Sequence, residues 1–357
     1  MLLVFHHNGL KSVLLVLMGI CSNCAALSNP TRSGFDKFTR KLSSILPNDI
    51  IPPMEAWDSP VEKTLLEKLG IAEADAEPKT FSIRPSQFWD IVTSSFNFIP
   101  RLGTGAFGDG YKIEIIPRDE SKYTIFSFGD YQIEETCAAP VVTSRYQPIQ
   151  IYEFEGCPFC RKVREAVTIL SLEVEFLPCP QDGPTFRKRF KKALGPLATF
   201  PYMIDPNTGI DLSQSDEIVA YLFKVYSSRE GYVVPPLLRP GALTTVTEGL
   251  ALFPRLGAGS KYKLSKLPPL PLRLWSYEAS PFCKIVKETL CSLELAHVQI
   301  SCPRGSPNRQ RLFNMTGRFQ VPYLEDPNEN IALFESATII EYCTKRYGIA
   351  TPTVNNL

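Results

Sequence analysis

The sequence predicts an α/β protein in which one module of alternating strands and helices occurs twice. The segment IYEFEGCPFCRKVREAVTILSLEVEFLPCP, which begins at Ile151, matches LWSYEASPFCKIVKETLCSLELAHVQISCP, which begins at Leu274. Cys160 corresponds to Cys283 at an offset of 123 residues, and ATFPYMIDPNTG matches FQVPYLEDPNEN further along at an offset of 121. A two-residue deletion in one loop therefore aligns the copies from end to end. Strands interleaved with helices of this length indicate an open α/β sheet.

Each copy is expected to follow the order β-α-β-α-β-β-α, because apolar residues change from alternating to helical spacing along it. The predicted elements of the first copy are a strand through Ile149 and Ile151, a helix that carries Val163, Val167 and Leu170, a strand that ends at Cys179, a basic helix at 184–194, two strands around the turn at 205–209, and a helix that starts near Ser213. The turn has proline at its second position, as β-turns favour.

The repeat extends upstream of both copies as a helix followed by PRLGxG. The first PRLGxG starts at Pro100 and the second at Pro254, and helical patterns precede them near 86–96 and 243–252. We expect this motif to be a glycine-rich helix stop that docks the connector. The alternative is that its arginines, Arg101 and Arg255, bind an anion. The first copy alone carries an inserted β-rich segment, at about 111–146.

These patterns divide the chain into seven parts. The expected boundaries are 1–26 for a signal-peptide-like leader, 27–80 for a transit-like or flexible segment, 81–147 for a helix, PRLGxG turn and β-rich insert, 148–228 for the first module, 229–271 for a Pro/Gly-rich connector with a helix and the second PRLGxG turn, 272–349 for the second module, and 350–357 for a tail. We expect no all-helical domain after either module.

Composition narrows the classes of function. The chain has 357 residues, and 38 Lys and Arg against 37 Asp and Glu give a net charge of +1, which argues against a nucleic-acid partner bound through a basic surface. The hydrophobic share of 44% is enough for real cores. Of three histidines, His297 alone lies beyond the leader. We therefore expect no metal site and no histidine-dependent hydrolase.

The N-terminus is expected to be a targeting address. The apolar run 12–20 follows Lys11 and precedes small residues around Ala26, which fits a cleaved signal peptide and is too short to span a membrane. The next stretch is rich in Arg, Lys, Ser and Thr, the composition of a transit peptide. Together they predict a plastid protein with no stable membrane span in the mature chain. Simple secretion is one alternative, and an ordinary amphipathic helix through Phe35, Phe38 and Leu42 is the other.

We expect the reactive site at Cys157-Pro158-Phe159-Cys160, between a strand and a helix. A cysteine at a helix N-terminus faces free N–H groups and the positive end of the helix dipole, both of which stabilise a thiolate. Cys157 would then be the nucleophile, and Cys160 would attack the resulting mixed disulfide. Zinc sites share this spacing, but the sequence offers no second CxxC or histidine pair to complete one.

The motif CPFC, the dipeptide Phe200-Pro201 and the pair Gln214-Ser215 make the first copy resemble the thioredoxin-like N-terminal domain of glutathione transferases, and the related glutaredoxins. The resemblance implies a cis proline facing the thiol, the residue before it offering its backbone to glutathione, and an acid or amide plus serine holding the γ-glutamyl end at a helix start. The implied positions are Phe200, Pro201, Gln214 and Ser215 in the first module and Val321, Pro322, Glu335 and Ser336 in the second. The implied cofactor is glutathione, and the implied partners are protein thiols or disulfides.

The second module departs at the key position, because Ser280 replaces the first cysteine. This is similar to serine-type glutathione transferases, in which serine hydrogen-bonds the glutathione thiolate. The alternative is a module kept for packing, with Cys283 buried and inert. The missing helical domain removes the usual pocket for a second substrate, so the resemblance favours a glutathione-linked thiol-disulfide oxidoreductase. A non-catalytic interaction or regulatory protein, and a transferase that uses Ser280, stay open as alternatives. The overall plan resembles the plastid tandem thioredoxin-fold proteins of plants and algae.

Overall fold

The computed structural model describes residues 63–72, 83–140 and 146–349. The predicted leader and tail lie outside these residues. The segment 27–80, expected to be transit-like or flexible, contains a described helix, α3 (Lys63–Lys68), whose Leu66 is buried in the core of the second module. Within the described ranges, the helices are all too short or too polar to cross a membrane.

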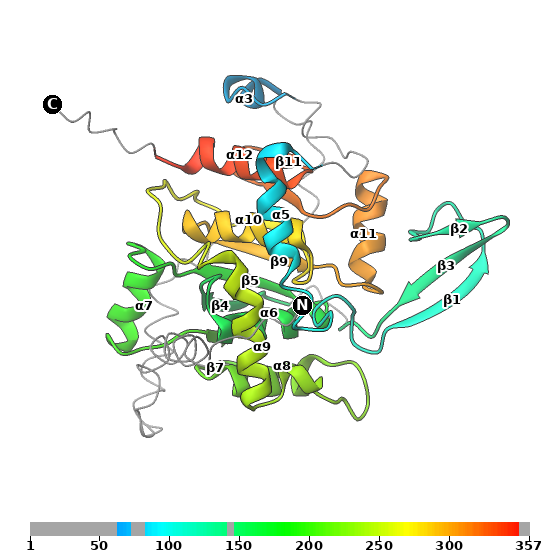
Figure 1. Ribbon diagram of the computed structural model, residues 1–357, viewed down its shortest axis with the longest axis horizontal. Helices are drawn as coiled ribbons and strands as arrows, with labels where there is room; N and C mark the ends of the chain where they lie inside the picture. The colour runs from blue at the N-terminus through cyan, green and yellow to red at the C-terminus, as the bar shows by residue number, and fades with distance from the viewer. Residues whose placement is uncertain (1–62, 73–82, 141–145, 350–357) are drawn as a thin grey trace, which may run out of the picture. The chain divides into compact units, whose positions relative to one another are not determined.

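The two modules share one eight-stranded sheet in the order β11-β10-β8-β9-β5-β4-β6-β7 (Figure 1). The first module contains β4 Ile149–Glu153, α6 Pro158–Ile169, β5 Glu173–Pro178, α7 Phe186–Leu194, β6 Tyr202–Asp205, β7 Ile210–Leu212 and α8 Ser215–Tyr226. The second contains β8 Leu272–Ser276, α10 Pro281–Ser292, β9 His297–Ser301, α11 Pro307–Thr316, β10 Tyr323–Asp326, β11 Ile331–Leu333 and α12 Ser336–Tyr347. The predicted order β-α-β-α-β-β-α is confirmed in both.

The modules meet through their edge strands. Strand β5 pairs with β9 in the antiparallel direction, with Val174 opposite Gln299 and Phe176 opposite His297. Inside each module the first two strands run parallel and the last two antiparallel. Because each module would otherwise expose an unpaired strand, the joint satisfies the backbone groups of both edges at once.

Helices cover both faces of the sheet. In the first module α6 and α8 bury Val167 and Leu222 against one face of the strands, whereas Phe190 of α7 packs with Tyr152 on the other. The second module repeats this arrangement with α10 and α12 on one face and α11 on the other. The cysteine-bearing helix thus lies inside a three-layer structure, which fixes its N-terminus at one end of the sheet.

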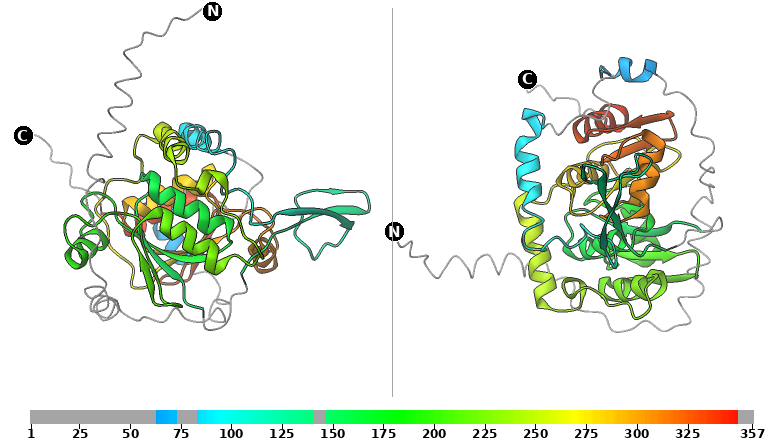
Figure 2. Two further views of the ribbon diagram at one scale, coloured as in Figure 1. Left: turned by 90° about the horizontal axis from the view of Figure 1, so that it is seen from below. Right: turned by 90° about the vertical axis from the view of Figure 1, so that its right-hand side faces the viewer.

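The connector helices are exchanged between the modules. Helix α5 (Phe88–Ser95) precedes the first module but packs on α10 of the second, and α9 (Ala242–Leu252) precedes the second but packs on α6 of the first. The 3-10 turns η2 (Pro85–Gln87), η3 (Pro236–Leu238) and η4 (Phe253–Arg255) flank them. The two helices lie end to end along one side of the described chain (Figures 1 and 2).

The arginine of each PRLGxG motif binds a glutamate on the first helix of a module. The Arg101 guanidinium is fully buried, and its Nε lies 3.1 Å from Oε1 of Glu165 in α6. Arg255 makes the equivalent contact with Glu288 in α10, at 3.0 Å. The docking role predicted for the motif is confirmed, and the anions that its arginines bind are carboxylates of the same chain.

The segment expected to be β-rich forms a three-stranded sheet in the order β1-β3-β2, which projects from the modules (Figure 1). Its strands are β1 Lys112–Pro117, β2 Ser127–Phe128 and β3 Tyr131–Thr136. Its base is held by an ion pair of 2.6 Å between Glu135 and Arg304. The insert therefore contacts the second module, although it precedes the first module in the sequence.

Candidate functional site

Cys157 is the N-cap of α6. Strand β4 ends at Glu153, a short turn follows, and Pro158 opens the helix at its first position, where its missing N–H is not needed. The backbone N–H of Cys160 donates to the Cys157 sulfur at 3.3 Å. The predicted placement of the first cysteine at a strand-to-helix junction agrees with this geometry.

The surroundings of Cys157 and Cys160 shift the pKa values of the two thiols in opposite directions. Burial by itself would raise the pKa of Cys157, but the hydrogen bonds from Cys160 and the charge of Arg164 lower it below its ordinary value. Burial raises the pKa of Cys160 well above its ordinary value, and the hydrogen bond to Cys157 adds to the effect. One sulfur is thus prepared to ionise while its neighbour holds its proton.

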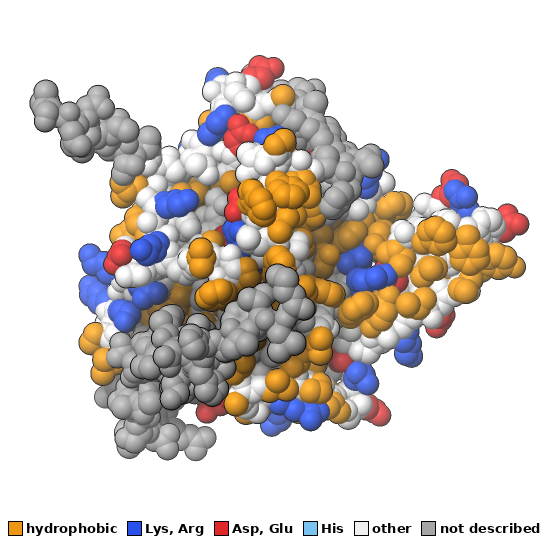
Figure 3. Space-filling view, viewed as in Figure 1, with side chains coloured by type: hydrophobic (Ala, Val, Ile, Leu, Met, Phe, Trp, Pro, Cys, Tyr) orange, Lys and Arg blue, Asp and Glu red, His pale blue; other side chains and the backbone are white. Residues whose placement is uncertain are grey.

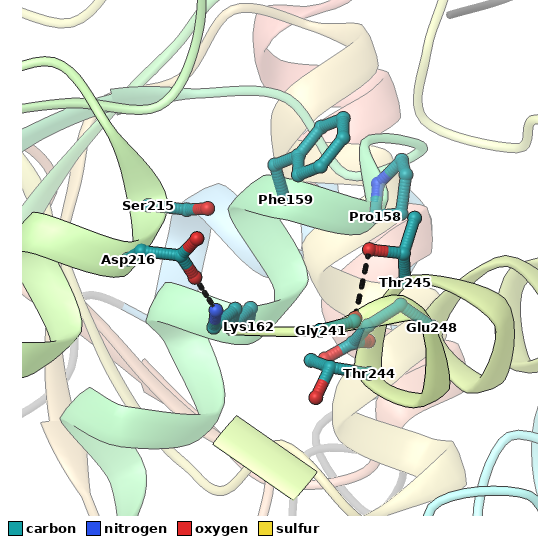
Figure 4. Close-up of a pocket in the computed structure, with 9 residues that line it drawn as sticks. All are labelled: Pro158, Phe159, Lys162, Ser215, Asp216, Gly241, Thr244, Thr245 and Glu248. Atoms are coloured by element: carbon teal, nitrogen blue, oxygen red, sulfur yellow. Dashed lines mark hydrogen bonds and ion pairs between the residues drawn. The ribbon is translucent and has the colours of Figure 1, made fainter. Parts of the chain in front are cut away.

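Access to the sulfur is narrow, because Cys157 is 5% exposed. A shallow pocket opens next to it and is lined by the two following residues, Pro158 and Phe159, but not by Cys157 itself (Figure 4). A substrate disulfide would reach the sulfur only after a small displacement of the residues around the cap.

The pocket lies where three helices of different sequence origin begin. Lys162 of α6 forms an ion pair with Asp216 of α8, and Ser215 starts α8 beside them (Figure 4). The opposite wall comes from α9 and its cap. The residues of this wall are Gly241, Thr244, Thr245 and Glu248. Backbone N–H groups at the start of α8 and the Lys162 ammonium make one end of the pocket suited to a carboxylate, and Asp216 suits an ammonium.

Both predicted cis prolines are present, at Phe200-Pro201 and Val321-Pro322. Strand β6 begins directly after the first of them, and its Tyr202 pairs with Tyr152 of β4. Pro201 therefore lies at the end of the sheet from which Cys157 emerges. The Phe200 ring packs on Phe190, with centroids 4.7 Å apart, under the guanidinium of Arg187 at 5.0 Å.

The corresponding region of the second module is more closed. Ser280 is 3% exposed, and its hydroxyl accepts from the backbone N–H of Cys283 at 3.2 Å. The Ser336 hydroxyl donates to the side chain of Gln87 at 3.5 Å, so the residue just before α5 lies over the start of α12. Glu335 has φ 64°, whereas its counterpart Gln214 has φ −108°. The Ser215 hydroxyl has no such partner among the described residues.

The remaining described cysteines are almost all core residues. Cys179, Cys283, Cys302 and Cys343 are fully buried, and Cys291 is 1% exposed. Burial raises the pKa of each of these thiols, so they are unsuited to nucleophilic attack at neutral pH. Half-buried Cys137 follows β3, and its sulfur lies 3.7 Å from the Ser171 hydroxyl. No cluster of metal-ligating side chains occurs in the ranges that the structure describes.

A cluster of buried charges, here called the interface cluster, joins the modules beneath the site. In the described part of the chain it has six carboxylates, Glu153, Glu155, Glu165, Glu248, Glu278 and Glu288, and six cations, Arg101, Arg161, Arg164, Arg255, Lys284 and Lys287. Its formal charge is therefore zero. Part of the cluster repeats at the offset of 123, so that Glu155 corresponds to Glu278 and Arg164 to Lys287. Arg164 contacts both acids, at 3.1 and 3.3 Å.

Sequence reasoning missed the wall supplied by α9 and the pairing of Lys162 with Asp216. Thr244 and Glu248 lie in a connector with no motif, and nothing in the sequence places that connector on α6 rather than α10. The pair is 54 residues apart and carries no local pattern. Both features depend on the exchange of the connector helices.

Comparison with known proteins agrees with the geometry of both modules. A model of the glutathione S-transferase N-terminal domain matches residues 151–230 and 274–352. A solved structure, Leishmania TDR1, described as a unique trimeric glutathione transferase, is 13% identical over 59% of this chain and 69% of that chain. Its TM-score of 0.21 is too low to support any statement about this chain. No curated protein matches the chain significantly.

Proposed function

Because the chain contains two tandem modules of the glutathione S-transferase N-terminal, thioredoxin-like type, we propose that it is a glutathione-linked thiol-disulfide oxidoreductase. The first module would carry the activity through Cys157 and Cys160. The observation that carries the proposal is the helix-capping sulfur of Cys157, which accepts the Cys160 N–H at 3.3 Å beside a pocket suited to a carboxylate.

In the proposed reaction the Cys157 thiolate attacks the glutathione-side sulfur of a mixed disulfide between glutathione and a protein. The substrate sulfur–sulfur bond breaks, the protein cysteine leaves as a thiolate and takes up a proton, and Cys157 becomes joined to glutathione. A second glutathione thiolate then displaces Cys157 and leaves as oxidised glutathione. Alternatively, Cys160 loses its proton to solvent and displaces glutathione, which forms a Cys157–Cys160 disulfide.

The residues around the pocket fit glutathione. Its γ-glutamyl carboxylate would bind the start of α8, where Ser215 supplies a hydroxyl and helix N–H groups supply donors. Its ammonium group would face Asp216. Gln214 at the cap and the backbone of Phe200 before cis Pro201 would hold the rest of the peptide, with its sulfur directed toward Cys157.

Closure of the second module favours a structural role for it over conjugation at Ser280. The Ser280 hydroxyl already caps α10, and Gln87 lies against Ser336. A bound glutathione would have to displace this contact before reaching Val321, Pro322 and Glu335. We therefore assign glutathione binding to the first module.

The pH dependence of alkylation tests the proposed nucleophile. Because the pKa of Cys157 is lowered, its thiolate persists to lower pH, and the iodoacetamide rate at this residue is expected to reach half its maximum below pH ~8.5, the value for free cysteine. Peptide-resolved mass spectrometry measures the rate, and Cys283 is the matched control that should not react. A midpoint at or above that of free cysteine would argue against the proposal.

Thermal protection by glutathione tests which module binds. Saturating glutathione is expected to raise the Tm of the wild-type chain, since a ligand that binds the native state stabilises it. Ser215→Ala should weaken glutathione binding by about tenfold, the loss expected for a hydrogen bond to a charged group. Ser336→Ala, the equivalent change in the second module, should leave the protection unchanged. Equal losses in both variants would contradict the assignment.

The 5% exposure of Cys157 favours one second candidate, a non-catalytic interaction or regulatory protein in which the CPFC dithiol is a buried relic or a disulfide switch. The two candidates differ in whether Cys157 reacts in the native protein. If Cys157 reacts with iodoacetamide only when the chain is unfolded in urea, the second candidate is the better account.

A further inference from the structure

Helices α5 and α9 carry most of their large apolar side chains on the solvent side. Their inner faces bury one large apolar side chain each, Ile91 on α5 and Leu252 on α9, and are otherwise small or polar, with Ser94, Thr244, Glu248 and Ala251 buried. Their outer faces expose Trp89 by 73% and Leu243 by 66%. A surface helix of a monomer has the reverse pattern, since burial of apolar area is what stabilises it. Figure 3 shows hydrophobic side chains gathered over α5.

The outer stripe occurs twice. On the first helix and its turn it consists of Trp89, Val92, Phe96, Ile99 and Leu102, and on the second of Leu243, Val246, Leu250, Phe253 and Leu256. Each member corresponds to its counterpart at an offset of 154, and the spacing of three and four residues is that of a helix-packing seam. Apart from half-buried Val92, all of them are at least half exposed.

The stripes form one surface because α5 and α9 lie end to end. Both helices contact η4, which closes the gap between them. At about 150–250 Å² per fully exposed aromatic side chain and somewhat less for aliphatic ones, the exposed parts amount to roughly 1,000 Å². The largest apolar patch of a typical monomer is about 300–600 Å², and a stable interface needs about 800 Å² from each partner.

We propose that this surface, the α5–α9 row, binds the same row of a second copy of the chain in a two-fold symmetric dimer. The row is already repeated within one chain, so a second copy offers the matching seam along the whole length. The charged residues of the two helices, Asp90 and Glu248, contact Arg255 and Arg101. Neither helix contains a lysine or an arginine, the residues by which an interfacial helix binds anionic lipid.

Sedimentation equilibrium and light scattering on the full chain test the proposal. The wild type should have twice the monomer mass of 40.0 kDa. The double variant Phe96→Glu, Leu250→Glu places two charges in the row and should raise the dimer Kd by at least about 100-fold. Both positions are at least half exposed, so the variant should keep the wild-type circular dichroism spectrum, and its Tm should fall only by what dimerisation contributes. Ile115→Glu, at an exposed apolar site on the insert, is the matched control and should stay dimeric.

An introduced cysteine provides a second measurement that does not depend on loss of binding. Leu250→Cys should form a disulfide-linked dimer on mild oxidation, and Ile115→Cys should not. A wild-type chain that is monomeric at all concentrations overturns the proposal. Binding of the row to vesicles of phosphatidylcholine and phosphatidylserine, or to residues 1–62 of the same chain, would then be the alternative. A dimer that Ile115→Glu dissociates and the row variant does not overturns it as well.

Discussion

Replacement of Cys157 by serine is expected to lower the glutathione-dependent rate of disulfide reduction by about 10³-fold or more, because a serine hydroxyl does not ionise near neutral pH. The second module shows that the substitution fits the fold. Ser280 occupies the equivalent cap and accepts the same backbone N–H, at 3.2 Å instead of 3.3 Å. The loss should therefore be chemical, with the Tm of the variant close to that of the wild type.

Cys160→Ser is the matched control for this prediction. It keeps the nucleophile and removes the resolving thiol, so it should retain the glutathione-dependent route and accumulate a Cys157–glutathione mixed disulfide. Reduction of a glutathionylated peptide, followed by mass spectrometry of the CPFC peptide, measures both effects. Equal activity in the wild type and Cys157→Ser would exclude Cys157 as the nucleophile and leave the interaction module as the better hypothesis.

The interior of each module was predictable because its signals are local. The strand through Ile151, the helical spacing of Val163 and Val167, and the turn at 205–209 each depend on neighbours within about ten residues. The repeat then doubled the information, since Phe200-Pro201 and Val321-Pro322 each support the other. The cap geometry at Cys157 follows from the same local rules and agrees with the prediction.

What joins the modules could not be predicted, because it consists of long-range pairing. No local sequence pattern shows that β5 will pair with β9. The pairing also buries His297, and this burial lowers its pKa to about 4, while its Nδ1 lies 3.1 Å from the Leu295 carbonyl oxygen. The charges of α6 carry no local signal of their partners either. Arg161 and Arg164 lie in the interface cluster, and Arg164 is also among the groups that lower the pKa of Cys157.

The second large effect is expected from Glu278→Gln, which removes one carboxylate from the interface cluster. Glu278 is fully buried and contacts Arg164 at 3.3 Å, Arg161 at 4.0 Å and Lys287. Loss of its charge leaves a net positive charge buried between the modules. Removal of one partner from a buried ion pair typically lowers the free energy of unfolding by about 3–5 kcal/mol. Urea unfolding followed by circular dichroism measures the change.

The pH dependence separates this charge effect from a packing defect. Burial alone would raise the pKa of Glu278, but Lys287 and Arg164 outweigh it and hold the pKa below its ordinary value. A carboxyl with a lowered native pKa contributes stability that is complete above its unfolded pKa and is lost as the pH falls toward the native one. The difference between wild type and Glu278→Gln should therefore shrink as the pH falls below about 4.

Glu120→Gln is the matched control, since Glu120 is 85% exposed and pairs with Arg118 at 3.4 Å. Exposed pairs contribute about 0–1 kcal/mol, so this variant should unfold like the wild type at every pH. A difference for Glu278→Gln that stays constant below pH ~4 would mean that the variant is destabilised by poor packing of the amide. If instead the difference disappears in acid, the charge of Glu278 contributes to the stability of the interface beside the β5–β9 pairing. Arg164, which pairs with Glu278, also lowers the pKa of Cys157, so one cation acts in both the interface and the site.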